Sequence, residues 1–496
     1  MSHQDDRPVG RRRPSRGRPR DRDSGGRRRT APTRARLLAV RVLERIERTR
    51  AYADLALHGA LARSDLPGPD RALATELVYG TLRWRGSLDF ALSQVLDREL
   101  TKLEPVVLSI LRTAAYQLVR TDRIPVSAAV DQAVRCARAA GAPRAAGLVN
   151  AVLRRIAESR DRIAWPDLEK DPIGHLTHAL SLPGWMAERW VEQFGVEEAA
   201  ALARASNAVP PRSLRANRRR IDVEALLAAL VPEHPGAHRC RYAPDGIVLE
   251  QRGHPGSDPL FLSGQYTVQD EASQLVVELL QPQPGERILD ACSAPGAKAT
   301  AIAERVGDAG AVVALDRHPR RLGLVRRDAR RLGVPCIETH ERDASRPLTD
   351  LGLFDRVLVD APCSGLGTLR RNPDARWRIQ PRDVERLADV QAGILRQAAA
   401  VLRPGGILVY STCTILPEEN EGVLEAFLAA SPDFRRTPRE GLPEAVRPLT
   451  LEDGSMRTLP HRHEMDGFFA ARVQRNPEAH AARADSGSAG PEARPA

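Results

Sequence analysis

Residues 287–298 read Arg287-Ile288-Leu289-Asp290-Ala291-Cys292-Ser293-Ala294-Pro295-Gly296-Ala297-Lys298. The stretch opens as a short strand, turns at Pro295 and Gly296, and continues into a helical pattern. Such a turn lets backbone amides and a helix N-terminus approach a bound ligand closely. We therefore predict that this stretch begins an open α/β sheet and cradles a ligand. The predicted cradle comprises Cys292, Ser293, Ala294, Pro295, Gly296, Ala297 and Lys298.

Downstream of this loop, strand and helix patterns alternate, which is typical of a doubly wound, Rossmann-like sheet. The catalytic domain is expected over residues 261–474, with a long helix at 383–402. In parallel sheets of this kind, ligands bind at the carboxyl ends of the strands. The expected strands are 287–291, 311–316, 335–339, 356–360 and 406–411.

Carboxylates stand near four of the predicted strand ends: Asp290, Asp316, Asp343 and Asp360. Asp316 follows Gly296 at the spacing of an acidic residue that accepts hydrogen bonds from ribose hydroxyls. Asp343 either accepts from an adenine amino group or caps the next turn. A nicotinamide dinucleotide shares the acidic spacing, but the Gly-x-Gly-x-x-Gly turn is absent. Four carboxylates at one rim suit a cationic sulfonium ligand instead.

Two cysteines follow neighbouring predicted strands, Cys363 in Asp360-Ala361-Pro362-Cys363 and Cys413 in Ser411-Thr412-Cys413. Either cysteine alone would be interpreted as a buried, inert thiol. Their placement as a pair favours thiol chemistry, such as the addition of a thiolate to C6 of cytosine that activates C5 for methylation. That reaction needs a nucleophile, an acid partner and a group that assists release.

The six cysteines are widely spaced and include no Cys-x-x-Cys pair, so neither a zinc knuckle nor a disulfide framework is indicated. We expect reduced thiols and no bound metal. The cysteines are Cys136, Cys240, Cys292, Cys336, Cys363 and Cys413.

The segment 33–160 repeats apolar residues three and four positions apart, which predicts an all-helical bundle. A proline at 105 stands near the start of one predicted helix. The expected helices are 34–47, 70–83, 104–119, 126–139 and 144–158.

Residues 161–260 are mixed and broken by Pro210-Pro211 and Pro232, so a small connecting domain is expected. A short strand is predicted at 213–217, just before the basic cluster Arg218-Arg219-Arg220. Arg215 and this cluster are candidates for contacts with an RNA backbone, with a solvated face as the alternative.

The formal net charge is +11, and residues 1–32 hold 11 arginines against 4 aspartates. This segment has no aromatic residue and almost no apolar one, so it is expected to be a disordered tail. It either touches nucleic-acid phosphates or serves solubility. The composition of residues 475–496 predicts a second loose tail. No run reaches the ~18 apolar residues that span a bilayer, so a cytoplasmic protein without a membrane partner is expected.

Three further motifs accompany the two cysteines: Gln269-Asp270-Glu271-Ala272-Ser273, Arg371-Asn372-Pro373-Asp374 and Asp466-Gly467-Phe468-Phe469. Together they closely resemble the Sun/NOL/NOP family of RNA 5-methylcytosine methyltransferases. The resemblance implies S-adenosylmethionine as cofactor, bound by the cradle together with Asp316, Asp343 and Asp360.

By the same resemblance, Cys413 is the nucleophile, Cys363 assists its release, and Asp360 contacts cofactor or cytosine. Lys298 is similar to the active-site lysine of the family, where a compact ammonium acts differently from a guanidinium. One departure is Ala297, where the family often has a second glycine. We expect the added methyl group to tighten the loop without abolishing cofactor binding.

The helical segment resembles the RNA-binding NusB family, through Asp70-Arg71-Ala72-Leu73-Ala74-Thr75-Glu76-Leu77-Val78-Tyr79-Gly80, Ile124-Pro125-Val126 and Gly147-Leu148-Val149-Asn150-Ala151-Val152-Leu153-Arg154. A NusB-like bundle before the methyltransferase domain implies one cytidine of 16S rRNA as the target, unstacked and flipped into the pocket. The expected partner is 16S rRNA or a small-subunit assembly intermediate, bound by a monomer.

Two other functions remain open at this point. A DNA cytosine-C5 methyltransferase also uses a Pro-Cys thiolate, which would make Cys363 the nucleophile. A non-catalytic ribosome assembly factor would bind RNA through the helical bundle, although the intact cysteines and complete cofactor loop argue against it.

Overall fold

The structure is a computed structural model that describes residues 32–122, 124–250, 256 and 258–478. The chain divides into two compact units. The predicted tails lie almost entirely outside the described residues, so they remain predictions. The first unit comprises 1–49, 56–78 and 92–162, and the second comprises 50–55, 79–91 and 163–496.

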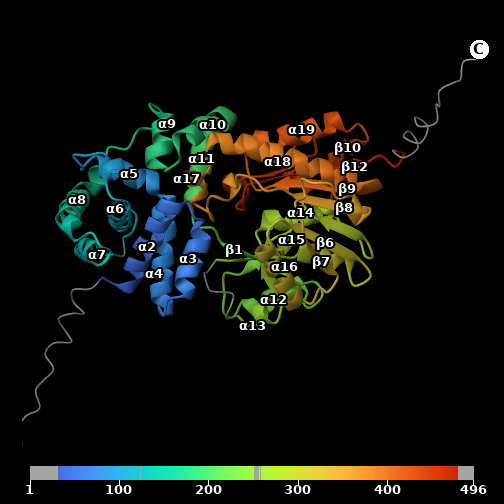
Figure 1. The fold of residues 1–496 in the computed structure, drawn as a ribbon, viewed down its shortest axis with the longest axis horizontal. Coiled ribbons are helices and arrows are strands. Elements are labelled where there is room, and N and C mark those ends of the chain that lie inside the picture. The colour runs from blue at the N-terminus through green and yellow to red at the C-terminus, as the bar shows by residue number, and fades with distance from the viewer. Residues whose placement is uncertain (1–31, 123, 251–255, 257, 479–496) are drawn as a thin grey trace, which may run out of the picture. The chain divides into compact units, whose positions relative to one another are not determined.

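The second unit contains a sheet with the strand order β10-β12-β9-β8-β5-β6-β7, whose last five strands are parallel (Figure 1). These five are the predicted strands, with their ends shifted by a few residues. Their carboxyl ends form one rim, as expected for parallel strands. The strands are β5 (Arg287–Asp290), β6 (Ala311–Asp316), β7 (Ile337–Glu341), β8 (Phe354–Asp360) and β9 (Leu402–Thr412).

Three C-terminal strands were not predicted: β10 (Phe434–Arg436), β11 (Met456–Thr458) and β12 (Phe468–Arg475). They extend the sheet in antiparallel fashion, with β12 between β9 and β10. The first four residues of β12 are all buried. A strand covered on both faces loses the apolar–polar alternation by which strands are recognised.

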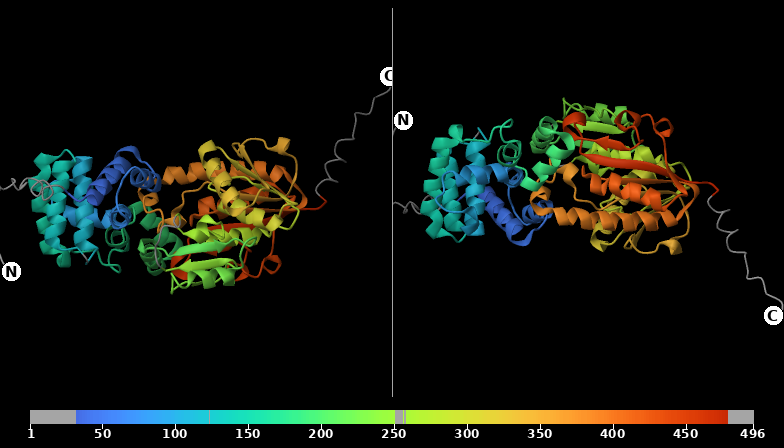
Figure 2. Two further views of the ribbon diagram at one scale, coloured as in Figure 1. Left: turned by 90° about the horizontal axis from the view of Figure 1, so that it is seen from below. Right: turned by 90° about the horizontal axis from the view of Figure 1, so that it is seen from above.

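Helices cover both faces of this sheet (Figure 2). One face packs against α14 (Glu271–Leu280), α15 (Ala297–Val306) and α16 (Pro319–Leu332). The other packs against α18 (Pro381–Ala400), the predicted long helix, and α19 (Glu421–Ala430). Both faces of the sheet are therefore buried under helices, and the carboxyl ends of its strands are available for chemistry.

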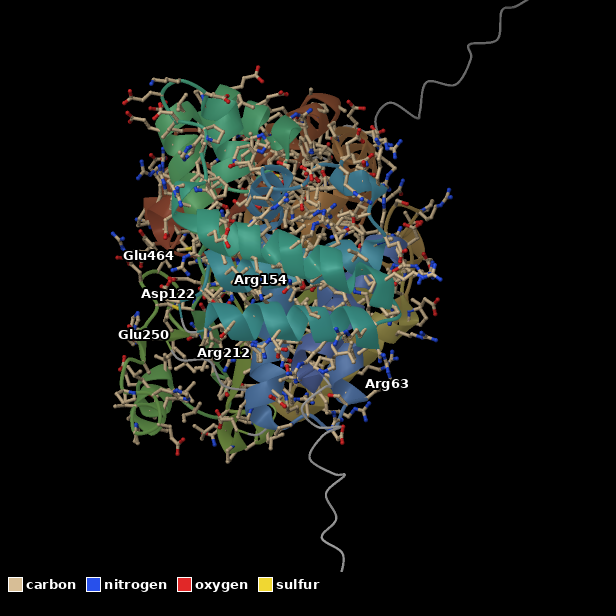
Figure 3. The ribbon with its side chains drawn as sticks, turned by 90° about the vertical axis from the view of Figure 1, so that its left-hand side faces the viewer. Arg63, Asp122, Arg154, Arg212, Glu250 and Glu464 are labelled. Atoms are coloured by element: carbon tan, nitrogen blue, oxygen red, sulfur yellow. The ribbon has the colours of Figure 1, made fainter. Side chains whose placement is uncertain are left out.

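The first unit is built from helices, and each of the five predicted ones is present. The central helix α6 is buried at every position from Val106 to Leu118, because its neighbours surround it. Arg154 on α8 is exposed and is labelled in Figure 3. The five are α2 (Arg34–Thr49), α4 (Gly68–Arg83), α6 (Pro105–Val119), α7 (Val126–Ala139) and α8 (Ala146–Ser159).

Among the helices up to residue 160, α3 (Ala53–Ala62) and α5 (Arg85–Ser93) were not predicted. Within the second unit, two connecting helices, α10 (Gly184–Phe194) and α11 (Val196–Asn207), pack against residues that follow β8 and β9. The shared core includes Trp190, which is fully buried, and Leu366. The connecting segment thus supports the rim loops.

A small antiparallel sheet of order β2-β3-β1-β4 follows these helices and includes the strand predicted at 213–217. Its strands leave an apolar face that is covered by α12 (Val223–Leu230). The strands are β1 (Arg212–Ala216), β2 (His238–Arg239), β3 (Gly246–Leu249) and β4 (Tyr266–Val268).

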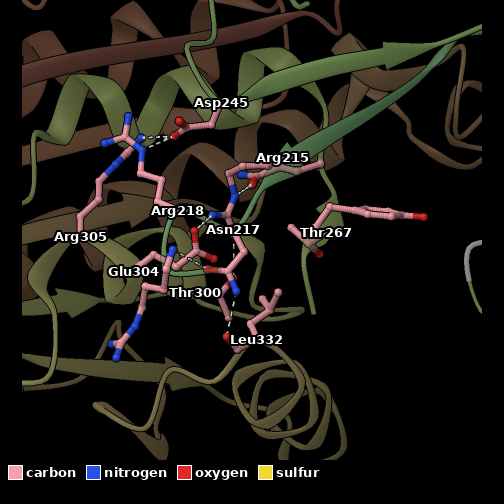
Figure 4. A network of polar contacts seen from close by, with 12 residues as sticks. Arg215, Asn217, Arg218, Asp245, Thr267, Thr300, Glu304, Arg305 and Leu332 are labelled. Atoms are coloured by element: carbon pink, nitrogen blue, oxygen red, sulfur yellow. Dashed lines mark hydrogen bonds and ion pairs between the residues drawn. The ribbon is translucent and has the colours of Figure 1, made fainter. Parts of the chain in front are cut away.

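The prediction that Arg215 contacts RNA is wrong, because only 2% of this residue is exposed. Its guanidinium forms an ion pair with Glu304 of α15 and donates to Gln269 Oε1 at 2.7 Å (Figure 4). A third contact goes to Thr300 Oγ1 at 3.2 Å. Side chains alternate along a strand, and β1 turns this one towards α15.

The basic cluster after β1 also makes contacts within the chain. Arg218 Nε donates to Asp245 at 2.6 Å, Arg219 pairs with Asp308, and Arg220 donates to the carbonyl of Ser263. The basic cluster therefore links the small sheet to the neighbouring segments that carry Asp245, Asp308 and Ser263. Its backbone neighbour Asn217 donates to the carbonyls of Gly264 and Leu332, each at 2.8 Å.

In the described part of the chain, no helix is both long and apolar enough to cross a bilayer.

Replacing Arg215 should test the buried ion pair. In Arg215→Ala, Glu304 would remain buried without its partner, so the free energy of unfolding should fall by about 3–5 kcal/mol. Urea unfolding measures this loss. The matched change Arg219→Ala removes an exposed pair and should have little effect; equal losses in the two variants would contradict the assigned role.

Candidate active site

The Asp360 carboxylate is held from two sides at the rim. The β8–β9 register places it opposite Ser411, whose Oγ donates to Asp360 Oδ1 at 2.9 Å. Lys298 Nζ donates to Asp360 Oδ2 at 2.7 Å. Three elements, α15, β8 and β9, thus meet on one side chain.

Lys298 lies in the first turn of α15, where it is buried. Burial by itself lowers the pKa of Lys298, but Asp360, Cys413 and Asp290 outweigh burial and raise it above its usual value. The Phe468 ring lies 5.3 Å from the ammonium nitrogen, a cation–π contact. The side chain is therefore a fixed positive charge beside the rim.

The two motif cysteines meet: their Sγ atoms are 3.4 Å apart, and both residues are partly exposed. The hydrogen bond with Cys413, followed by burial, raises the pKa of Cys363 well above its usual value. The charge of Glu419 acts in the same direction. The two thiols thus have different charged neighbours: the charge of Glu419 acts on Cys363, whereas Cys413 interacts with the Lys298 cation.

Glu419 was not predicted as a site residue. It is fully buried and accepts hydrogen bonds from the Ser364 amide at 2.8 Å and from Gln391 Nε2 at 2.9 Å. Gln391 also donates to the carbonyl of Pro362 at 3.0 Å. These bonds fix the loop that carries Cys363. No local sequence signal identifies Glu419, because its partners Ser364 and Gln391 lie 55 and 28 residues away along the chain.

The cradle has the predicted geometry. Gly296 has a φ of +116° at the N-cap of α15, and a Cβ there would lie 3.1 Å from Val325 Cα. Glycine is the residue that tolerates both constraints. Arg321 supports the loop by donating to the Ala294 carbonyl at 2.6 Å and pairing with Asp316 at 3.3 Å.

Within the described residues, three buried oxygen atoms of the cradle have no hydrogen-bond partner: both carboxylate oxygens of Asp290 and Ser293 Oγ. Buried polar atoms are normally paired, so these acceptors fit a polar ligand. A ligand with a cationic sulfonium, an amino group and ribose hydroxyls supplies the missing donors and positive charge. S-adenosylmethionine has each of these groups.

Burial raises the pKa of Asp290 to about 7, with the nearby Asp360 adding to the shift and Lys298 opposing it. Asp290 was noted at the rim but was not predicted to bind cofactor. The sequence signal for such a role was the position of Asp290 at the end of β5.

Asp316 and Asp343 occupy their predicted strand ends. Asp316 is buried and accepts from the His318 amide at 2.8 Å. Asp343 is exposed and accepts from the amide and hydroxyl of Ser345 at 3.0 and 2.7 Å, and these bonds lower its pKa. Asp343 therefore caps a turn, while a contact with adenine remains a prediction.

The three accompanying motifs form one ion-pair network. Asp466 pairs with Arg370 at 2.6 Å and with Arg371 at 2.8 Å, and Arg371 reaches Asp270 at 2.6 Å. Burial raises the pKa of Asp466, an effect that the two arginines oppose. The network anchors the start of β12 beside α14.

This anchor continues to the nucleophile candidate through the backbone. Gly467 N donates to the Gly367 carbonyl at 2.8 Å, and Gly367 N donates to the Cys413 carbonyl at 2.9 Å. A Cβ on Gly367 would lie 1.9 Å from the Gly467 oxygen. Only glycine permits this approach, so the motif containing Asp466 positions Cys413.

Three family models match the chain in the predicted order. Residues 33–158 match the NusB family, 182–254 match a ferredoxin-like domain of RsmF/B-like methyltransferases, and 277–474 match 16S rRNA methyltransferase RsmB/F. The predicted fold class, a helical NusB-like domain, a small domain and a methyltransferase domain, is confirmed.

Similar proteins extend over most of the chain. A probable ribosomal RNA small subunit methyltransferase B of Bacillus subtilis is 36% identical, covering 89% of this chain and 99% of its own length. The ribosomal RNA small subunit methyltransferase B of Pseudomonas putida is also 36% identical, covering 88% and 98%. The crystal structure of PH0851 superposes with a TM-score of 0.75 at 26% identity, covering 89% and 98%.

The raised pKa of Asp290 predicts a pH-dependent stability. A carboxyl whose folded pKa exceeds its unfolded value stabilises the fold below the unfolded pKa and loses this contribution as pH rises through the folded pKa. For Asp290 the window runs from its ordinary value of ~3.9 to about 7. Asp290→Asn should therefore gain stability over the ligand-free wild type as pH rises, by on the order of a few kcal/mol.

Urea unfolding of the ligand-free protein at about pH 5 and about pH 8 measures this change. Asp343→Asn is the control: because the pKa of Asp343 is lowered, its contribution changes only in acid. A stability difference for Asp290→Asn that stays constant with pH would show that Asp290 is already charged in acid.

Proposed function

Since this chain belongs to the RsmB/F family of ribosomal RNA small subunit methyltransferases, we propose that it methylates C5 of one cytidine in 16S rRNA through a covalent cysteine adduct. S-adenosylmethionine is the cofactor. It supplies an electrophilic methyl group, and the cradle with Asp290 and Asp316 would hold it. The remaining chemistry falls to the side chains at the rim.

The observation that carries the proposal is the unequal environment of the two thiols. The Lys298 cation interacts with Cys413, whereas the charge of Glu419 acts on Cys363. A positive charge beside a sulfur stabilises negative charge on it, and a negative charge opposes it. This difference in neighbouring charges supports Cys413 as the attacking group and Cys363 as the partner that assists its release.

In the proposed reaction, the Cys413 sulfur forms a bond to C6 of cytosine, and the electron pair of the C5–C6 double bond becomes available at C5. Asp360, whose carboxylate is fixed by Lys298 and Ser411, would contact the cytosine during this addition. After C5 has been methylated, a water molecule takes up the C5 proton, the C5–C6 double bond is restored, and the Cys413 sulfur leaves as a thiolate. Cys363 assists this release by donating a hydrogen bond to the departing sulfur, 3.4 Å away.

The partner is proposed to be 16S rRNA or a small-subunit assembly intermediate, with the NusB-like helices adding RNA contacts. We also propose that the protein acts as a monomer in the cytoplasm, where ribosomal RNA is made. Bisulfite sequencing of rRNA from cells with and without the protein tests the target: one cytidine of 16S rRNA should lose protection when the protein is absent.

The two cysteines should give opposite phenotypes. Cys413→Ala should lower the rate of methyl transfer by on the order of 10³-fold or more and should form no covalent adduct with RNA. Cys363→Ala should accumulate a covalent RNA complex, because attack proceeds and release does not. A denaturing gel with radiolabelled RNA detects the complex.

Cys336→Ala is the control, because this thiol lies before β7, away from the carboxyl rim, and its loss should leave methyl transfer intact. A covalent complex in Cys413→Ala, with none in Cys363→Ala, would reverse the assignment and favour the thiol usage of DNA cytosine methyltransferases.

A further inference from the structure

Helix α16 and the two residues before it carry a concentration of positive charge. Residues 317–332 hold seven arginines and one aspartate, a formal charge of +6. The whole chain carries +11, of which residues 1–32 carry +7. All other residues together therefore sum to −2, so this segment carries more net positive charge than the rest of the chain beyond the N-terminal tail.

Four exposed arginines of this helix, Arg320, Arg326, Arg327 and Arg330, are here called the α16 basic face. None of the four forms an ion pair with any residue that the structure describes. Their observed contacts are neutral, from Arg326 to Thr339 Oγ1 at 2.9 Å and from Arg330 to a backbone carbonyl. The charges thus face solvent without compensation.

The remaining helical arginines have internal partners. Arg321 pairs with Asp316 at the cradle, and Arg331 pairs with Asp328 at 3.3 Å while donating to the Tyr266 carbonyl at 2.9 Å. These two therefore support the fold. The α16 basic face differs from these two arginines in having no ion pair with a described residue.

Spacing along the helix places the exposed arginines on one side. Residues three and four apart lie about 5–6 Å from each other, so Arg326, Arg327 and Arg330 are neighbours. From Arg320 to Arg330 the face extends about 15 Å at 1.5 Å per residue. Like charges at this spacing destabilise a helix by a few tenths of a kcal/mol, so helix stability does not account for them.

The helix on the opposite face of the sheet provides a comparison. Helix α18 has three arginines, Arg382, Arg386 and Arg396, balanced by Asp383, Glu385 and Asp389. The charged side chains of α18 therefore have both signs, and their charges sum to zero. Because α18 is longer and its three arginines are also exposed, solubility alone does not require the charge of α16.

The position of α16 relates its basic face to the rim. The helix begins three residues after β6 ends, so Arg320 lies at the carboxyl rim and Arg330 lies towards the other end of the strands. Adjacent strands are about 4.8 Å apart, which places β6 roughly 10–15 Å to the side of the thiols on β8 and β9. That distance corresponds to a few nucleotides of an RNA strand.

We infer that the α16 basic face binds backbone phosphates of the RNA substrate, on nucleotides that flank the one at the thiols. Arginine suits this partner, because its planar guanidinium bonds phosphate oxygens bidentately. Such contacts fix register and orientation without reading bases. The inference rests on the ribosomal RNA substrate of the family and is independent of which base position is methylated.

The test compares two triple variants with equal loss of charge. Arg320→Gln, Arg327→Gln and Arg330→Gln remove three of the four charges of the α16 basic face, and Arg382→Gln, Arg386→Gln and Arg396→Gln make the matched change on α18. Each full-length protein is titrated with a 16S rRNA transcript at several KCl concentrations. Calorimetry with S-adenosylmethionine checks that each variant retains an intact cradle.

The α16 variant should bind RNA about tenfold or more weakly near 0.1 M salt, and its salt slope should fall by about 2, or ~0.7 for each lost contact to single-stranded phosphate. The α18 variant should match the wild type. Equal weakening in both variants, or no change in either, would overturn the inference. Because binding is measured without methyl transfer, a failure of the proposed cytosine chemistry would leave these titrations unchanged.

Discussion

The contact between Lys298 and Asp360 is the interaction on which the site depends. It joins the first turn of α15, which closes the cradle, to the end of β8, which leads to Cys363. Asp360 in turn binds Ser411, two residues before Cys413. A buried ammonium is tolerated because this carboxylate offsets its desolvation. One ion pair thereby fixes the cradle, both cysteine loops and the charge beside Cys413.

Two sets of contacts from neighbouring elements stabilise the Lys298–Asp360 pair and the cysteine loops. The small sheet holds α15 through Arg215 and Glu304, so a domain with no residue at the rim still supports the cradle helix. On the other side, Asp466 and its arginines hold β12, whose backbone reaches Cys413 through two glycines. The motifs that surround the cysteines in the sequence therefore position them without touching the reacting atoms.

Sequence reasoning succeeded where structure is local. The five parallel strands, the turn at Gly296 and the helices of the first unit follow from apolar spacing and turn chemistry. It failed for β12, which is buried on both faces, and for Arg215, whose basic neighbours suggested a surface. Glu419 and the unpaired oxygens of Asp290 escaped notice, since their significance lies in what surrounds them. Burial depends on elements that are distant in the chain, and no local pattern encodes it.

By itself, the sequence determined which residues stand at the strand ends, because strand direction and length fix where each strand stops. It also determined that two cysteines, a lysine and several carboxylates share one rim. The tertiary structure alone decided that the two thiols lie 3.4 Å apart, that Lys298 pairs with Asp360, and that Arg215 is internal. Those outcomes depend on side chains from separate elements meeting at short range, which packing decides and sequence spacing does not.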